Sequence, residues 1–343
     1  MNTIRRLLQY VRDTGQLLLG AIAFAATGKT PDYAYQSMIR LFCMSAGRSN
    51  DVLSNALEMV HPKYKIEKAE GVLGNLGESE LQRIASAIAT RGYYVFPQQL
   101  PNALCDRLLD FALESECLAS PTDLDPPGTP ARRMPRYERE SPTAVRYDFD
   151  AQLVIENADV QQLMADASLL ALAQCYLGCR PVLDVMTMWW NTAYSEQPDR
   201  IAAQFYHFDM DRIKWLKVFI YLTDVGSQSG PHCFIAGSHR TGGIPPHLLR
   251  QGYTRLTDQE VGGFYLPDDF VEFTATRGTI IFEDTRGLHK GQHVQREDRL
   301  MLQLQFSNSL FGGDYPPVRV ARIAHPPLDE MARRYPRLYR NYL

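Results

Sequence analysis

The strongest constraint on the fold is a series of short β-prone segments downstream of Arg180. They are rich in Val, Ile, Phe, Tyr and Leu, and turns containing glycine separate them. The segments cover residues 182–190, 203–209, 215–223, 232–236, 279–283 and 300–306. Because they do not alternate with helices in a βαβ rhythm, they predict an antiparallel barrel or jelly roll rather than a parallel sheet. The sequence also has no GxGxxG or P-loop signature, which removes the main support for the nucleotide-binding classes.

Upstream of these segments the chain has mostly helical patterns. Thr30 and Pro31 form a helix-start signal, with the proline at the first helical position. Three further helical patterns cover residues 78–90, 102–116 and 167–177, and a short β-prone run at 93–96 ends at Pro97. We therefore expect a mainly β fold whose barrel core has helices packed outside it and an N-terminal helical extension.

The length of 343 residues corresponds to two domains of roughly 150 residues, or to one larger domain with inserts. A hydrophobic share of 45% is sufficient for a sizeable core and excludes disorder as a description of the whole chain. We assign residues 1–75 to the helical extension, 76–315 to the barrel domain and 316–343 to a C-terminal tail. Inserts at 119–147 and 241–270 are expected to shape the mouth of a pocket in the barrel.

The first insert, residues 119–147, has an unusual composition. Its six prolines and five arginines predict a loop rather than a core element. Two interpretations stay open, a solvated connection and a basic lid over an acidic or phosphorylated substrate. The arginines are compatible with a small anionic substrate, such as a carboxylate, a phosphate or a coenzyme A conjugate.

Charge and cysteine usage limit the partners and the compartment. A net charge of −3 provides no general attraction to nucleic acid or to an anionic membrane, apart from what a local basic patch would supply. Six cysteines form no CxxC pair, which favours buried thiols in a reducing compartment over a disulfide framework. We therefore expect a cytoplasmic protein that acts on a small molecule and does not bind nucleic acid.

The N-terminus resembles a secretory signal in part. Arg5 and Arg6 precede an apolar run at residues 17–26, but Arg12 and Asp13 stand between them. The run is about ten residues long, too short to cross a bilayer of ~30 Å, so no transmembrane segment is expected. An amphipathic docking helix is the favoured interpretation, and a signal segment stays as the alternative. The N-terminal helices have three possible roles: covering the barrel, forming a dimer contact or touching a membrane surface.

The segment 203–209 contains the sequence His207-Phe208-Asp209. Residues i and i+2 of a strand point to the same face, so an imidazole and a carboxylate would project together and occupy adjacent positions on a metal. A third ligand must come from another strand. The downstream candidates are His232, His239, His247, His289 and His293.

His289 is the favoured third ligand because it follows a buried-looking strand and a turn. Two histidines and one carboxylate occupy one face of an octahedron, the arrangement typical of non-haem Fe(II) oxygenases. Arg299 follows ten residues later and opens an apolar strand. A guanidinium inside a barrel requires an anion, and its geometry matches a carboxylate. His293 competes with His289, but it would leave only six residues before Arg299.

As an ordered set, these motifs resemble those of the phytanoyl-CoA dioxygenase family, most clearly over residues 203–306. The matching segments are 204–209, 218–225, Gly230-Pro231-His232, Gly237-Ser238-His239-Arg240, Gly278-Thr279, Asp284, His289-Lys290-Gly291 and Arg299. The resemblance implies a double-stranded β-helix (jelly roll or cupin-like) dioxygenase that binds Fe(II) through His207, Asp209 and His289. It further implies 2-oxoglutarate and O₂ as co-substrates, with the distal carboxylate of 2-oxoglutarate on Arg299 and decarboxylation to succinate. The expected reaction is hydroxylation of a small organic metabolite, and desaturation or ring formation stay as alternatives.

Other residues follow from the resemblance and from the strand pattern. Tyr221 and Asn191 are expected near the co-substrate, with a packed strand aromatic and a turn amide as the alternatives. Candidate substrate-pocket residues are Gln204, Arg212, Lys214, His232 and Trp190. Lys217 is interpreted as part of a solvated strand edge. Because neighbouring strand residues point to opposite faces, only one of Trp189 and Trp190 is expected to face the pocket.

Two other classes of function stay open. A cupin-like protein would bind a metal or ligand in the same barrel without catalysis, and would be expected to lack Arg299 or part of the metal triad. A metal-dependent hydrolase or isomerase would use the metal to activate water, and would not need an arginine for a dicarboxylate. The fold alone does not distinguish these classes from an oxygenase.

Overall fold

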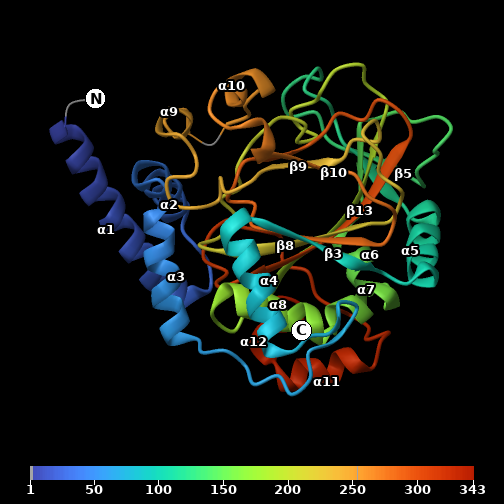
Figure 1. The fold of residues 1–343 in the computed structure, drawn as a ribbon, viewed down its shortest axis with the longest axis horizontal. Helices are drawn as coiled ribbons and strands as arrows, with labels where there is room; N and C mark the ends of the chain where they lie inside the picture. Colours follow the sequence, from blue (N-terminus) through green and yellow to red (C-terminus); the bar gives the residue numbers. More distant parts are fainter. Residues whose placement is uncertain (1–2, 253) are drawn as a thin grey trace.

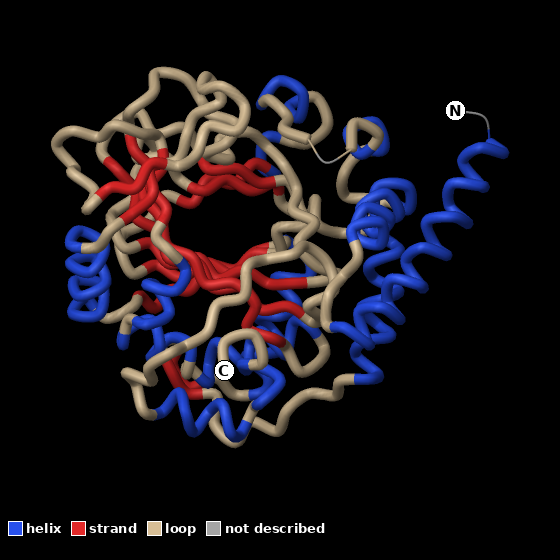
Figure 2. The backbone as a smooth tube through the Cα atoms, turned by 180° about the vertical axis from the view of Figure 1, so that it is seen from behind, coloured by secondary structure: helices blue, strands red, loops and turns tan. Residues whose placement is uncertain are grey.

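The computed structural model describes residues 3–252 and 254–343. Apart from one two-stranded hairpin, its strands form two antiparallel sheets that face each other, with a layer of helices on the outer side of the larger sheet (Figure 2). In spatial order the larger sheet contains β3 (Tyr93–Gln99), β11 (Thr279–Glu283), β8 (Trp215–Tyr221), β13 (Asp298–Ser307), β7 (Val182–Thr192), β6 (Arg146–Asp148), β4 (Cys117–Ala119) and β5 (Arg132–Met134). The smaller sheet contains β10 (Phe270–Phe273), β9 (His232–Ile235) and β12 (His289–Gly291). The predicted antiparallel barrel core with helices outside it is confirmed.

The side-chain alternation of β13 separates the interior of the barrel from the helix layer. Leu300, Leu302 and Leu304 are buried in the large core between the sheet and the helices. Arg299 and Gln303 point the other way and line the space between the two sheets. Because the strand period is two, one strand can supply apolar side chains to the core and polar side chains to a cavity.

The helix layer covers the outer face of the larger sheet. It contains α4 (Glu78–Arg91), α5 (Asn102–Glu114), α6 (Ala151–Glu156), α7 (Ala158–Met164) and α8 (Ala167–Leu177). The residues assigned to a C-terminal tail form α11 (Pro327–Arg334) and α12 (Pro336–Tyr339). Leu328, Leu338 and Tyr342 of this segment are buried in the same core, so the tail packs against the barrel and its helices.

The N-terminal extension forms three helices, α1 (Thr3–Thr27), α2 (Asp32–Ser45) and α3 (Arg48–Val60), on one side of the barrel (Figure 1). A small hairpin of β1 (Glu70–Gly71) and β2 (Gly74–Asn75) follows them. Met38 and Phe42 of α2 pack in a second core with Phe208, which lies between two of the predicted metal ligands. The extension therefore supports the strand-like segment that carries the predicted site.

The structure corrects several local predictions. Residues 203–209 form no regular strand and contribute only isolated bridges at Tyr206 and His207. The second helix begins at Asp32 with Pro31 in the N-cap position, and the Thr30 hydroxyl instead accepts a hydrogen bond from the Gly312 backbone N–H. Strand β3 continues beyond Pro97 because it lies at the edge of its sheet, where a proline leaves no hydrogen bond unmade.

The two inserts contain short elements of their own. The predicted loop at 119–147 includes β5 and the beginning of β6, which extend the larger sheet at its far edge. The insert at 241–270 includes α9 (Pro246–Leu249), α10 (Asp258–Gly262) and the 3₁₀ turn η1 (Pro267–Asp269). None of the described helices is long and apolar enough to cross a bilayer.

We predict that Leu338→Ala lowers the free energy of unfolding by about 2–5 kcal/mol, because it opens a cavity in the common core. Urea unfolding followed by circular dichroism measures this. The matched control is Leu124→Ala at a side chain that is 89% exposed, where a change within about 0.5 kcal/mol is expected. Equal unfolding free energies for the two variants would contradict the placement of α12 in the core.

Candidate metal centre

A reciprocal backbone bridge brings His207 and His289 together although 81 residues separate them in the sequence. The His207 N–H donates to the His289 carbonyl over 2.9 Å, and the His289 N–H donates back over 2.8 Å. The two rings therefore lie side by side, with centroids 4.2 Å apart. The predicted strand at 203–209 is absent, but this one bridge is sufficient to align the two imidazoles.

Asp209 completes a compact set of ligand atoms. Its carboxylate lies 3.7 Å from Nε2 of His207 and 3.4 Å from Nε2 of His289. The Asp209 N–H donates to the Thr285 carbonyl over 2.8 Å, which ties the carboxylate to the loop that precedes His289. One ligand atom from each of the three residues lies within 4.8 Å of the others, and all three residues are buried. The structure thus confirms that the three predicted metal ligands converge.

Both imidazoles are oriented for metal binding. Nδ1 of His207 donates to the Phe205 carbonyl and Nδ1 of His289 to the Gly287 carbonyl, each over 2.9 Å. A carbonyl only accepts, so each Nδ1 carries a proton, and each Nε2 faces the Asp209 carboxylate as the ring nitrogen left to bind a metal. Burial and the neighbouring His289 hold the pKa of His207 well below its usual value, which keeps it in the neutral form that binds metals.

Lys217 is a residue at the site that the sequence interpretation missed. Its ammonium lies 2.6 Å from Oδ2 of Asp209 and 3.4 Å from Oδ2 of Asp211. Burial opposes ionisation of Asp209, but Lys217 and His289 outweigh it and hold the pKa of this carboxyl well below its usual value. The interpretation of Lys217 as a solvated strand edge is wrong, because all seven residues of β8 are buried. Lys217 stands two residues before Phe219 in an apolar strand, so both side chains point to the same face of that strand. This spacing was the sequence signal that Lys217 faces the interior.

Arg299 is a buried cation without an acidic partner among the residues that the structure describes. Its Nη2 donates to Oδ1 of Asn191 over 2.6 Å and its Nη1 donates to the Gly230 carbonyl, whereas its Nε has no hydrogen-bond partner. Burial lowers the pKa of the guanidinium, as expected where no anion compensates it. The unpaired Nε and the missing counter-charge fit the carboxylate of a bound dicarboxylic acid.

The metal ligands and Arg299 line one cavity of about 280 Å³ between the two sheets. On β13, Arg299, Gln303 and Gln305 all face this cavity, and the step from Arg299 to Gln305 spans roughly 20 Å along the strand. The neighbouring strand β7 of the same sheet contributes Asn191 and Trp189. The cavity therefore has a cationic end at Arg299 and a row of hydrogen-bonding side chains leading away from it.

Of two further predicted site residues, His232 lines the cavity and Tyr221 lies behind it. His232 lines it, and its Nε2 lies 3.0 Å from Oε1 of the buried Glu283. Tyr221 does not line it, because its hydroxyl donates to the Phe273 carbonyl over 3.0 Å and accepts from the His232 N–H over 3.0 Å. Tyr221 thus ties the larger sheet to the smaller one directly behind His232. Its predicted contact with a co-substrate stays a prediction.

The structure does not bring Trp190 and Gln204 into the cavity. Trp190 points to the opposite face of β7 and packs on Tyr137, and Trp189 faces the cavity instead. Gln204 accepts from the Asp199 N–H over 2.8 Å through its Oε1, which holds the turn before the metal motif. Both predictions of substrate contact are therefore corrected, because side-chain direction depends on strand register and turn geometry.

Arg212 forms a buried ion pair instead of facing a substrate. Its Nε and Nη2 donate to the two oxygens of Asp184 over 2.6 and 2.7 Å. Its Nη1 donates to the carbonyls of Leu310 and Gly313. Arg212 thereby fixes the chain that follows β13, and Tyr315 of this chain lines the metal cavity. The prediction of substrate contact for Arg212 is corrected to a clamp on one wall of the cavity.

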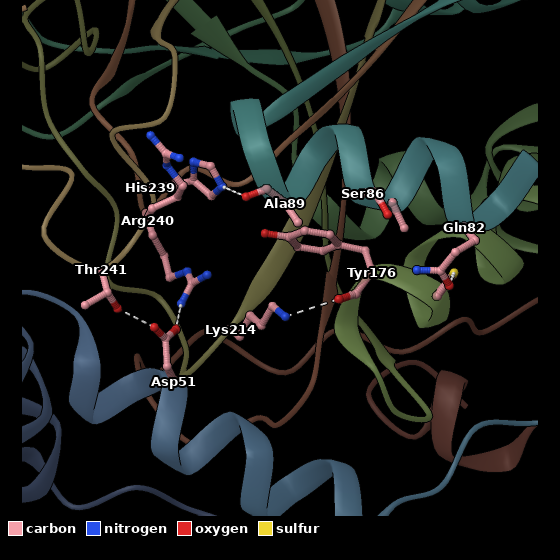
Figure 3. A pocket seen from close by; sticks show the side chains of 12 residues that line it. Asp51, Gln82, Ser86, Ala89, Tyr176, Lys214, His239, Arg240 and Thr241 are labelled. Atoms are coloured by element: carbon pink, nitrogen blue, oxygen red, sulfur yellow. Dashed lines mark hydrogen bonds and ion pairs between the residues drawn. The ribbon is translucent and has the colours of Figure 1, made fainter.

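Lys214 lies in a different cavity of about 330 Å³, shown in Figure 3. Its ammonium donates to the Tyr176 carbonyl over 3.1 Å, and its prediction as a substrate residue of the metal site is corrected. Asp51 and Arg286 line this cavity as well. Arg286 belongs to the loop between β11 and β12 that leads to His289, and none of the three metal ligands lines this cavity.

The loop that carries His289 depends on a buried ion pair. Nε and Nη2 of Arg286 donate to Asp284 over 3.0 and 2.7 Å, and the Tyr176 hydroxyl donates to the same carboxylate. Burial disfavours the charge of Asp284, but Arg286 outweighs it and lowers the pKa of this carboxyl to about 2. This pair stabilises the turn between β11 and β12, in which Thr285 holds Asp209 and Gly287 orients His289.

We predict that Asp284→Asn destabilises the protein by about 3–5 kcal/mol at neutral pH, because it leaves the Arg286 guanidinium buried without its counter-ion. The stabilisation by Asp284 is present above its unfolded pKa of ~4 and is lost as the pH falls towards 2. The difference between wild type and variant should therefore shrink between pH 4 and pH 2. Urea unfolding at several pH values measures it, and a constant difference would contradict the assignment.

The other candidate histidines make contacts that leave them outside the metal cluster. Nε2 of His293 lies 2.8 Å from the Ser195 carbonyl, and Nε2 of His239 lies 3.1 Å from the Ala89 carbonyl. The ring of His247 packs against Phe264.

We predict that His289→Ala abolishes stoichiometric Fe(II) binding, whereas the matched variant His293→Ala retains it. Iron content of the purified variants checks this, and loss of iron only in His293→Ala would exchange the two assignments.

The chain was compared with known protein structures and sequences. The α-ketoglutarate-dependent epimerase SnoN from nogalamycin biosynthesis is 17% identical over 67% of this chain and 84% of its own, with a TM-score of 0.44. HygX from Streptomyces hygroscopicus, solved with nickel and 2-oxoglutarate, is 15% identical over 68% and 87%, with a TM-score of 0.45. EctD from S. alaskensis, solved with 2-oxoglutarate and 5-hydroxyectoine, is 19% identical over 72% and 79%, with a TM-score of 0.43. No curated protein sequence matched the chain.

A comparison with protein families matches residues 88–295 to the family described as phytanoyl-CoA dioxygenase (PhyH). The match spans more than half of the chain and contains all three members of the metal cluster. Iron suits this set of two imidazoles and one carboxylate, and the unpaired Arg299 suits 2-oxoglutarate. The chain therefore belongs to the phytanoyl-CoA dioxygenase family of Fe(II)- and 2-oxoglutarate-dependent oxygenases, with the double-stranded β-helix fold.

Proposed function

We propose that this protein is an Fe(II)- and 2-oxoglutarate-dependent dioxygenase that hydroxylates a small polar metabolite and converts 2-oxoglutarate to succinate and CO₂. The observation that carries the proposal is the position of Arg299, a buried cation with an unpaired Nε, in the same cavity as His207, Asp209 and His289. A cupin-like binding protein or a hydrolase would have no use for this arginine. The intact combination favours an oxygenase.

Each group of the site has a separate task in this proposal. Iron with a bound 2-oxo acid supplies the activation of O₂ and the oxidative decarboxylation of that acid. His207 and His289 offer Nε2 as ligands, since their Nδ1 protons are held by backbone carbonyls. Lys217 holds one oxygen of Asp209 over 2.6 Å, which keeps this carboxylate ionised and fixed in orientation.

Arg299 is proposed to bind the distal carboxylate of 2-oxoglutarate. Asn191 orients the guanidinium through Nη2, and the Trp189 indole N–H donates to the same amide oxygen over 2.9 Å. Gly291 keeps the space beside the guanidinium open, because a Cβ there would lie 3.2 Å from Nη2. Asn191, predicted to contact the co-substrate, is better described as a positioning residue for Arg299.

The remaining walls of the cavity favour a substrate with hydrogen-bonding groups. Gln303, Gln305, Asp211 and Tyr315 line the part of the cavity away from Arg299. Arg212 and Lys214 do not line this cavity, so they no longer support the expectation of an anionic substrate. Arg146, at the end of the arginine-rich insert, does line the cavity, but it is paired with Asp148 over 2.6 Å. We therefore assign the substrate to small polar molecules.

The test is an anaerobic titration of iron-free protein with Fe(II) and then 2-oxoglutarate, followed by visible spectroscopy. We predict a weak charge-transfer band that requires both additions and is absent in His289→Ala. Arg299→Gln should raise the 2-oxoglutarate concentration needed for half-saturation at least ~10-fold, because a charged hydrogen-bonded pair is lost. The exposed Arg296→Gln on the adjoining turn is the matched control and should leave the titration unchanged.

Two outcomes would contradict the proposal. Folded, iron-loaded protein without the band would exclude chelation of 2-oxoglutarate and favour the cupin-like binding protein. A band that persists unchanged in Arg299→Gln would place the co-substrate elsewhere in the cavity. Where the band appears, succinate release in air during a screen of small polar molecules identifies the substrate class.

A further inference from the structure

Helix α1 presents an apolar stripe to solvent in two clusters, Ile4 to Val11 and Leu18 to Ile22, with Thr14 and Gly15 between them. Seven large aliphatic side chains are each between 61% and 68% exposed, and their spacing of three, four and seven residues places them on one helix face. They are Ile4, Leu7, Leu8, Val11, Leu18, Leu19 and Ile22. The stripe, from Ile4 to Ile22, extends over roughly 27 Å at a rise of 1.5 Å per residue. Single exposed leucines are ordinary, but seven exposed aliphatic side chains on one face of a helix mark an interaction surface.

The opposite face of α1 holds the helix against the protein. Asp13 is fully buried there and accepts a hydrogen bond from Arg40 of α2 over 2.8 Å. Leu17 is also buried, and Gly20 lies so close to Ala34 that a Cβ would be 2.1 Å from the Ala34 side chain. An amphipathic helix normally turns its apolar face to the core. In α1 the face with Asp13, Leu17 and Gly20 docks on the protein, which leaves the exposed aliphatic stripe outward on a fixed support.

The position of α1 makes the stripe accessible. The helix lies at the outer edge of the N-terminal helices, and its first turns project beyond the body of the protein in both views (Figures 1 and 2). Helix α2 lies between α1 and the barrel, and it takes the other face of α1. The stripe is therefore presented away from the metal cavity.

The charges on α1 have one sign on the exposed side. Asp13 is the only acidic residue of the helix, and its buried carboxylate is paired with Arg40 over 2.8 Å and lies 3.9 Å from Nε of Arg12. Arg5, Arg6 and Arg12 are exposed. On a helical projection Arg5 and Arg12 flank the apolar stripe on the same side. An apolar face bordered by arginines is the arrangement with which helices lie in the interface of anionic bilayers.

A second copy of the chain fits the stripe less well. Pairing two α1 helices through their stripes would bring Arg5 and Arg12 close to the same residues of the other copy, and α1 has no free carboxylate to pair with them. Leu7 and Leu19 also widen the stripe beyond the narrow seam of a two-stranded coiled coil. The helix is not apolar enough to span a bilayer, so it would lie in the plane of the membrane surface.

We propose that α1 docks this protein on anionic lipid surfaces, with the stripe inserted among the lipids and Arg5 and Arg12 on their headgroups. The test is sedimentation of the full-length protein with phosphatidylcholine vesicles that contain or lack phosphatidylglycerol. Binding is expected with the anionic vesicles, and added salt should weaken it because the arginine contacts are solvent-exposed. Leu8→Gln/Leu18→Gln should lower the affinity at least ~10-fold through lost apolar burial.

The chain offers matched controls. Leu124 and Leu266 lie outside α1 and are 89% and 71% exposed, so Leu124→Gln/Leu266→Gln removes at least as much exposed leucine as the test variant without touching the stripe. This control should bind vesicles like wild type. Arg5→Gln/Arg12→Gln should bind more weakly and with less salt dependence. All the substituted side chains are exposed, so the variants are expected to fold like the wild type. Circular dichroism checks this.

Three results would overturn the proposal. Failure of the wild type to bind anionic vesicles would do so directly. A dimer in analytical ultracentrifugation that Leu8→Gln/Leu18→Gln converts to monomers, without vesicle binding, would assign the stripe to a second copy. Equal binding to neutral and anionic vesicles would show that Arg5 and Arg12 do not contact anionic headgroups, which contradicts the proposed selectivity for anionic lipids. The readout does not depend on iron or 2-oxoglutarate, so it is independent of the proposed oxygenase activity.

Discussion

The metal site depends on one pair of backbone hydrogen bonds, between His207 and His289. These bonds join two segments that are not otherwise strands of one continuous sheet, and they set the two imidazoles next to each other. The third ligand follows from the same contact, because the Asp209 N–H reaches the Thr285 carbonyl of the loop that leads to His289. Three ligands are thus positioned by backbone geometry, before any side-chain packing is considered.

The polar residues around this bridge divide into two groups with different physical roles. Arg212 with Asp184 and Arg286 with Asp284 are saturated buried ion pairs, and each fixes a chain segment that borders the site. Arg299 is buried to a similar degree but lacks an acidic partner among the described residues. Burying a cation costs free energy unless an anion compensates its charge. An arginine paired with a carboxylate therefore has a structural role, whereas a buried arginine without one indicates a binding site for an anionic ligand. Burial alone would not have made this distinction.

Much of this organisation could be predicted from the sequence. The position of Arg299 at the start of an apolar strand predicted a buried guanidinium that needs an anion, and the His-x-Asp spacing predicted two adjacent ligands. Other predictions failed where local pattern was insufficient. Trp190 was chosen over Trp189, and Lys217 was interpreted as solvated, because the register that decides which residues face the cavity is set by pairing with distant strands.

By itself, the sequence determined the antiparallel architecture, the type of metal ligands and the amphipathic character of the first helix. These features depend on local spacing, which neighbouring residues establish on their own. Only the tertiary structure decided that His289 rather than His293 meets His207, that Arg212 and Lys214 lie outside the cavity, and that α1 turns its apolar stripe outward. Each of these depends on contacts between residues far apart in the chain, and such contacts are selected by closure of the barrel and by packing of the whole core.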